Sequence, residues 1–183
     1  MKNTLRALFI FTLLFSCSTE DDSNNSQNYC ETDIPFLQSG RVMNYLYSGV
    51  SGTSITIGNC DENGYEVERI SPFGTGTDIW RQNGDYLETD SNGNGDYWSK
   101  IYKLNAQLGD TWTHTQADGD EVTHTVISVD STITVPAGTF TCKVFKYDNT
   151  GIINSSYVFW HDEIGNIKED AGFLILELES YEE

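Results

Sequence analysis

The sequence has few basic residues. Lys and Arg number 10 against 28 Asp and Glu, and the net charge is −18 at neutral pH. Such an excess of negative charge is repelled by phosphate backbones and anionic lipid head groups, which excludes nucleic-acid binding. Proline, histidine and cysteine are also scarce, with 3, 3 and 4 residues. No segment shows the 3.6-residue apolar periodicity of an amphipathic helix, so a helical fold is excluded as well.

The one continuous apolar stretch lies at the N-terminus, over residues 7–15. It follows Lys2 and Arg6 and is shorter than the roughly 20 residues of a membrane-spanning helix. It ends in Leu14-Phe15-Ser16-Cys17, which resembles the lipobox of bacterial lipoproteins. We therefore expect residues 1–16 to be a signal peptide and the sulfur of Cys17 to carry a diacylglycerol anchor in the membrane.

An acidic, Ser- and Asn-rich segment follows the cysteine. Residues 17–29 are expected to form a flexible tether, and residues 30–183 a single domain. The cluster Glu20-Asp21-Asp22 resembles the surface-export signal of Bacteroidota lipoproteins. This resemblance implies a protein anchored in the outer membrane and exposed on the cell surface. Loss of the two basic residues of the leader would take the net charge from −18 to −20.

The pattern of residues 30–183 is that of a β-protein. Short β-prone runs alternate with turn signals every eight to twelve residues, as at Asn83-Gly84. In the clearest run, residues 139–147, Phe140, Cys142 and Val144 share one face and polar residues share the other. The prediction is an all-β fold: one antiparallel meander of about ten strands, curled into a barrel, half-barrel or two-sheet sandwich.

Three cysteines remain besides Cys17, namely Cys30, Cys60 and Cys142. An oxidising compartment permits one disulfide among them, and three pairings are possible. Cys142 lies in the middle of an apolar strand and is typical of a small buried hydrophobe. A Cys30–Cys60 disulfide is therefore preferred.

Three segments together are familiar: Leu108-Gly109-Asp110-Thr111-Trp112, the run from Val135 through Pro136-Ala137-Gly138-Thr139-Phe140 to Cys142, and Ile164-Gly165-Asn166-Ile167-Lys168. In this order they resemble a group of uncharacterised secreted and lipid-anchored β-proteins with the pattern VPAGTF.C. The resemblance implies an antiparallel barrel or half-barrel, loosely like the lipoprotein carriers that hold acyl chains. It implies no activity. Within the pattern, Pro136 and Gly138 suit a tight corner, where glycine supplies φ > 0.

The segment around residue 95 predicts two surface sites, a calcium loop and an aromatic face for ligand binding. Asp90, Asn92, Asn94 and Asp96 place oxygen ligands at alternate positions, like the opening of a calcium loop, so calcium is a possible ligand although no cofactor is required. Tyr97, Trp98 and Tyr102 would form an exposed aromatic face able to stack on a sugar or grip a hydrophobic ligand.

Three functions are compatible with these features. The first is a non-enzymatic binding or accessory lipoprotein for a hydrophobic or glycan ligand, or for an envelope protein partner. This is preferred because no catalytic constellation is recognisable. The second is a metal-assisted hydrolase that uses His114, His124 or His161. The third is a purely structural or adhesive surface module.

Overall fold

We describe a computed structural model of the chain over residues 28–91, 93, 95–152 and 154–182. All regular structure in these residues is β-strand, and the described part of the chain has no helix long and apolar enough to cross a membrane. The strands are β1 (Val42–Tyr47), β2 (Val50–Asp61), β3 (Gly64–Ser71), β4 (Gly74–Asn83), β5 (Tyr86–Asp90), β6 (Ser99–Lys103), β7 (Thr111–Thr115), β8 (Glu121–Val135), β9 (Gly138–Asn149), β10 (Ser156–His161), β11 (Gly165–Asp170) and β12 (Ile175–Glu182).

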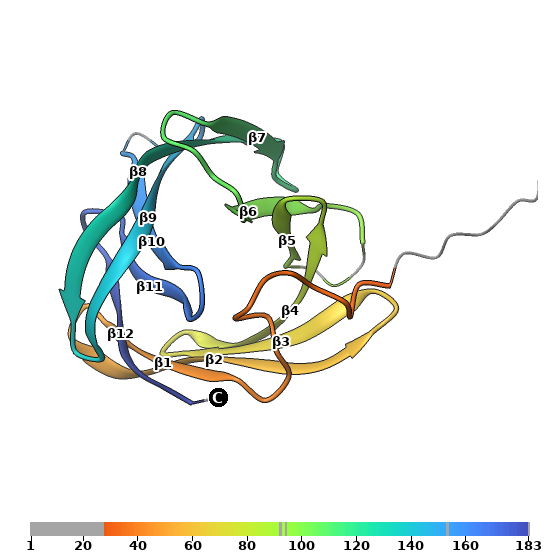
Figure 1. The fold of residues 1–183 in the computed structure, drawn as a ribbon, viewed down its shortest axis with the longest axis horizontal. Helices are drawn as coiled ribbons and strands as arrows, with labels where there is room; N and C mark the ends of the chain where they lie inside the picture. The colour runs from red at the N-terminus through yellow and green to blue at the C-terminus, as the bar shows by residue number, and fades with distance from the viewer. Residues whose placement is uncertain (1–27, 92, 94, 153, 183) are drawn as a thin grey trace, which may run out of the picture.

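The strands form one antiparallel sheet that curls into a nearly closed barrel (Figure 1). Strands that follow one another in the chain are neighbours in the sheet, except β6 and β7, and β1 also pairs with β12, so the order runs β6-β5-β4-β3-β2-β1-β12-β11-β10-β9-β8-β7. The predicted all-β meander is confirmed. Of the three predicted shapes, which were a barrel, a half-barrel and a two-sheet sandwich, the sheet has that of a nearly closed barrel. It has 12 strands, where about ten were expected, because every short run between turn signals finds a partner.

The seam between β6 and β7 is bridged by side chains. The Trp112 indole donates to the carbonyl of Lys100 at 3.0 Å, and the Tyr147 hydroxyl donates to that of Ile101 at 2.8 Å. Lys143 donates to the carbonyl of Leu104 at 2.7 Å. The first two bonds satisfy carbonyls of the edge strand β6, and the third satisfies the carbonyl of Leu104, which directly follows it.

The barrel has two different ends, because the connections of an antiparallel meander alternate. The connections at residues 62–63, 84–85, 104–110, 136–137 and 162–164 share one end with the segment that precedes β1. We call this the plugged end. The connections at residues 48–49, 72–73, 116–120 and 171–174, with the described residues of the β5–β6 and β9–β10 connections, share the other, which we call the open end.

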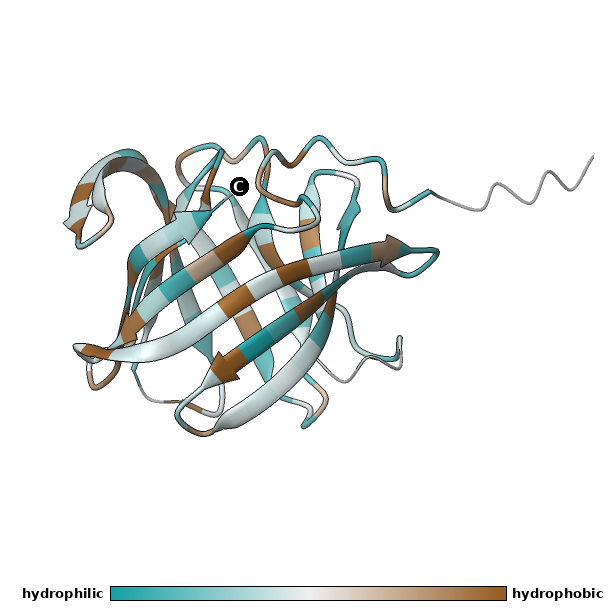
Figure 2. Cartoon of the chain, turned by 90° about the horizontal axis from the view of Figure 1, so that it is seen from below, coloured by the Kyte–Doolittle hydropathy of each residue, from teal (hydrophilic) through white to brown (hydrophobic). Residues whose placement is uncertain are grey.

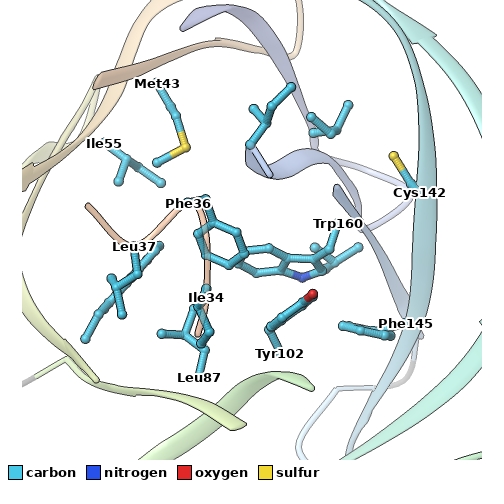
Figure 3. Packing of buried hydrophobic residues seen from close by; sticks show 14 of the residues in the cluster. Ile34, Phe36, Leu37, Met43, Ile55, Leu87, Tyr102, Cys142, Phe145 and Trp160 are labelled. Atoms are coloured by element: carbon cyan, nitrogen blue, oxygen red, sulfur yellow. The ribbon is translucent and has the colours of Figure 1, made fainter. Parts of the chain in front are cut away.

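Residues 34–37 form a plug that crosses the lumen (Figures 1 and 3). Ile34, Phe36 and Leu37 are fully buried, and the Phe36 ring lies 5.4 Å from the rings of both Trp160 and Tyr102. The plug is held to the barrel wall by two hydrogen bonds to Gln82 Oε1, from the Thr32 hydroxyl at 2.7 Å and the Asp33 amide at 2.6 Å. Apolar side chains of the N-terminal segment thus complete the core, as they would a strand face.

The core follows the alternation of the strands. Apolar bands recur along them (Figure 2), and core side chains at inward positions are buried, such as Ile57, Val67, Leu87 and Phe145. One residue of the family-like segments, Gly165, has a clear structural role. Gly165 has a φ of 102°, and a Cβ at this position would lie 3.3 Å from the Phe36 ring, so the plug requires this glycine.

The structure joins Cys30 to Cys60 with a Cα–Cα distance of 5.7 Å, the pairing preferred from the sequence, and Cys142 is a buried free thiol. The disulfide fastens the start of the plug segment to β2. Cys17 and the predicted leader lie outside the described residues, so the signal peptide, the lipid anchor and the domain bounds 1–16, 17–29 and 30–183 stay predictions.

Candidate functional site

The lumen beneath the open end contains a cavity in two adjoining chambers. The outer chamber has a volume of about 500 Å³ and is lined mainly by β1 to β4, β11 and β12. Its apolar wall includes Tyr47, Ile70, Phe73, Leu174 and Leu176. Ligand cavities in proteins have this size and this apolar character, with a small number of polar groups that fix orientation.

The inner chamber, of about 240 Å³, lies deeper and is lined by Trp80, Ile101, Tyr147, Val158 and Trp160 among others. Four residues line both chambers and therefore mark the passage between them: Ile55, Arg69, Asn166 and Glu169. Alternation explains the deeper wall, since Trp80 and Trp160 occupy inward positions of β4 and β10.

Charged side chains in the cavity are unequally compensated. Arg69 makes a two-pronged ion pair with Asp78, with distances of 2.6 Å from Nε to Oδ2 and 2.8 Å from Nη2 to Oδ1. The Asp78 side chain is 5% exposed and that of Arg69 is 48% exposed, so the pair reaches from the lumen toward its mouth. Paired guanidinium and carboxylate groups neutralise one another and fix each other's orientation.

Glu169 has no such counter-ion within the described residues. Burial raises the pKa of its carboxyl above the ordinary value. The hydroxyls of two nearby tyrosines are already engaged. Tyr45 donates to the carbonyl of Asn166 at 3.0 Å, and Tyr147 donates to that of Ile101 at 2.8 Å. Glu169 is thus an acid that faces the cavity without a basic or hydroxyl partner among the residues that the structure describes.

Several buried polar atoms of the cavity wall also lack a hydrogen-bond partner within the described ranges. They are Thr53 Oγ1, Trp80 Nε1, Thr89 Oγ1, Trp160 Nε1 and Asn166 Oδ1. A buried polar group without a partner costs about 1–3 kcal/mol of folding free energy, so native proteins contain few. Their concentration around one cavity indicates a space that a polar molecule or group completes.

Sequence reasoning missed Arg69, Asp78, Asn166 and Glu169. A usable signal was present for the acids, because Asp78 lies two residues before Trp80, and Glu169 lies two residues after Ile167. A charge in phase with core positions of a strand points inward. Asn166 gave no such signal. It faces the cavity because the β10–β11 register shifts between Phe159 and Trp160, which is a β-bulge, and bulges re-aim side chains.

Apolar side chains crowd one side of the open rim. Phe73, at the tip of the β3–β4 hairpin, is 79% exposed, and Phe173, at the tip of the β11–β12 hairpin, is 80% exposed. Val50, at the β1–β2 hairpin between them in the sheet order, is also exposed. Phe73 packs edge-on against Tyr47, with the ring centroids 5.4 Å apart, and so links the rim to the cavity wall.

The predicted aromatic face is not assembled as expected. Tyr102 is fully buried at the plugged end, where its hydroxyl donates to Asp162 at 2.7 Å, so it belongs to the core. Its inward position on β6, opposite Leu87, is the physical reason. Trp98 precedes β6 and stacks on the Arg81 guanidinium at 3.4 Å, and Tyr97 alone of the three is well exposed.

The predicted calcium loop is described only in part. Asp90, at the end of β5, is buried and accepts a hydrogen bond from the amide of Gly95. Asp96 is exposed, while Asn92 and Asn94 lie outside the described residues. Calcium binding therefore stays a prediction, and no group of three or more metal-ligating His, Cys, Asp or Glu side chains occurs in the described part of the chain.

The histidines are divided between the two ends of the barrel. His114 Nδ1 and His124 Nε2 lie 3.3 Å apart, and His124 is fully buried between Trp112 and Tyr147. Burial, with a smaller contribution from His114, lowers the pKa of His124 to about 3. His161 ends β10 toward the plugged end, whereas β7 runs from Thr111 toward the open end. His161, an alternative to His114 and His124 in the hydrolase hypothesis, thus lies apart from that pair.

Comparison with known proteins bears on the fold. No protein-family model and no curated protein sequence matches the chain. A solved structure from Bacteroides fragilis NCTC 9343, described as an exported protein by inference and as having a YmcC-like fold, is similar. It has a TM-score of 0.52 and 15% sequence identity over 80% of this chain and 97% of that chain. At this identity the likeness shows a shared fold.

Proposed function

We propose that this protein is a non-enzymatic, extracytoplasmic lipoprotein whose β-barrel holds a small amphipathic ligand in the cavity beneath its open end. The observation that carries the proposal is the two-chamber cavity, whose apolar wall includes buried polar atoms without hydrogen-bond partners in the described residues. A lumen that served only as a core would be filled by side chains, as the plugged end is.

The location rests on separate support. The leader and Cys17 are typical of a bacterial lipoprotein, the disulfide suits an oxidising compartment, and the structural neighbour is described as exported. Labelling of cells with a radioactive or clickable palmitate analogue tests the anchor. Wild-type protein should take the label in the membrane fraction, and the Cys17→Ser variant should not. Labelling that survives the substitution would refute anchoring through Cys17.

The ligand is tested by native mass spectrometry of residues 18–183 produced in a bacterial periplasm. A bound molecule at one copy per chain is expected. The Gly76→Phe variant supplies the decisive comparison, because Gly76 lines the outer chamber and a Cβ there meets only Arg69 Nη2, at 3.8 Å. The phenyl ring would occupy the chamber and reduce the bound fraction.

The matched control is Thr77→Phe, which places the same ring at the next position of β4, on the outer face. It should bind as the wild type does. A bare protein mass for the wild type, or equal binding by the two phenylalanine variants, would contradict a ligand in the cavity.

A further inference from the structure

The cavity wall presents an unbalanced set of charges and hydrogen-bonding groups. One cation and two acids line the two chambers: Arg69, Asp78 and Glu169. Because Arg69 and Asp78 satisfy each other through two contacts, the remaining charge is the carboxylate of Glu169. The lining therefore has a net charge of about −1, in a chain whose overall charge is −18.

Asn166 adds to the same imbalance. Its Oδ1 atom is buried, has no hydrogen-bond partner in the described part of the chain, and belongs to one of the four residues that line both chambers. Asn166 and Glu169 lie on the same strand, β11, so two acceptors face the passage between the chambers. The nearby hydroxyl protons of Tyr45 and Tyr147 are engaged with main-chain carbonyls and do not compensate them.

From this arrangement we infer that the ligand is an organic ammonium ion with an apolar body, whose N–H groups bind Glu169 and Asn166. This inference rests on the proposed function and specifies the ligand class. An ammonium group supplies three donors and one positive charge, and it would pair the carboxylate of Glu169 and the Oδ1 atom of Asn166, because the guanidinium of Arg69 is already paired with Asp78. It would also give the half-buried carboxylate of Glu169 a counter-ion and so offset part of the cost of its desolvation.

The rest of the cavity suits the same ligand. Trp80, Trp160 and Tyr147 line the inner chamber, and aromatic rings attract cations to their faces. Ile55, Ile70, Leu174 and Leu176 supply the apolar wall of the outer chamber toward the rim, where an alkyl body would lie. An anionic amphiphile such as a fatty acid would bring a second negative charge beside Glu169 and is disfavoured.

The test uses three probes with the same eight-carbon chain: octylamine, octanol and octanoate. Each is titrated into residues 18–183 at pH 7.5 in 150 mM salt, by calorimetry and by the fluorescence of the tryptophans that line the inner chamber. Octylammonium should bind about tenfold or more tightly than octanol, as expected of a charge-assisted hydrogen bond, and octanoate should bind most weakly.

The variants separate the site from the general charge of the surface. Glu169→Gln should bring octylamine binding to within about threefold of octanol while octanol binding is retained. Glu177→Gln is the matched control. Glu177 lies on the neighbouring strand β12, opposite Lys168 on the outer face, to which it is paired at 2.9 Å. This variant should keep the full preference for ammonium.

Two results would overturn the inference in distinguishable ways. If octanol or octanoate binds as tightly as octylamine, or if Glu169→Gln keeps the preference, the head-group assignment is wrong while the cavity still binds ligands. If none of the three probes binds to the wild type, or if all three bind to the Gly76→Phe variant as tightly as to the wild type, both the proposed binding function and the head-group assignment fail.

Discussion

The plug offers the sharpest test of how this barrel is stabilised, through the substitution Phe36→Ala. Phe36 is fully buried and contacts the rings of Trp160 and Tyr102, each at a centroid distance of 5.4 Å. Truncation removes these contacts and leaves a cavity that the surrounding strands cannot fill. The free energy of unfolding should fall by about 3–5 kcal/mol. For a domain of this size the midpoint of thermal unfolding should fall by about 6–20 °C.

Phe73→Ala is the matched control for this substitution. It removes the same side chain from the open rim, where Phe73 is 79% exposed, so the change in stability should stay within about 0.5 kcal/mol. Urea unfolding of residues 18–183, followed by circular dichroism, measures the free energy of unfolding of both variants. The slope of this free energy against urea concentration is compared with that of the wild type. A loss below about 1 kcal/mol for Phe36→Ala would refute the placement of the plug within the core.

Three further measurements test other parts of the molecule. Replacement of both Cys30 and Cys60 by serine should lower the free energy of unfolding by about 3–4 kcal/mol, because a loop of 30 residues is released in the unfolded chain; an unchanged urea midpoint would contradict the disulfide. Arg69→Leu leaves the buried carboxylate of Asp78 unpaired and should lower the free energy of unfolding by about 1–3 kcal/mol in the same assay. The loss should lie at the lower end of this range because the arginine is half exposed. An unchanged free energy of unfolding would show that the ion pair is dispensable. The pKa of His124 is depressed to about 3, so the unfolded chain binds a proton below pH 6.5 that the folded chain does not, and stability falls as the pH falls from 6.5 toward 3. Between pH 6 and pH 5, His124→Phe should flatten this fall by about 1 kcal/mol, and parallel curves for the two proteins would contradict a neutral buried histidine.

The fold was predictable because its causes are local. Alternation within residues 139–147 predicts a strand, and β9 spans Gly138–Asn149, but Phe145 and Tyr147, on the face predicted to be polar, pack in the lumen, so the predicted face was wrong in this part of the strand. Asn83-Gly84 predicts a hairpin, and β4 and β5 form one, with Asn83 as the last residue of β4 and Gly84-Asp85 as the connection. Closure of the sheet was not predictable to the same degree, since pairing of β1 with β12 joins residues at opposite ends of the domain that no local pattern relates.

The candidate site was less accessible to prediction. Tyr102 was assigned to an exposed face because it follows Tyr97 and Trp98 in an aromatic run, yet its strand position turns it inward. The plug has no period of its own, and its apolar residues are buried only because the barrel has a lumen to fill. Asn166 faces the cavity because of a β-bulge, a one-residue irregularity that no pattern in this sequence predicts.

The side-chain seam also has a mechanical meaning for the barrel. Adjacent strands elsewhere in the sheet are joined by ladders of main-chain hydrogen bonds, whereas Trp112 and Tyr147 bridge to β6, and Lys143 to Leu104 just after it, through single side-chain bonds. Side chains can rotate about their own bonds without disturbing the backbone that carries them. The circumference of the barrel is therefore most compliant along this line. Tyr147 and Ile101 belong both to the seam and to the inner chamber, so widening of the barrel there changes the chamber that a guest molecule would occupy.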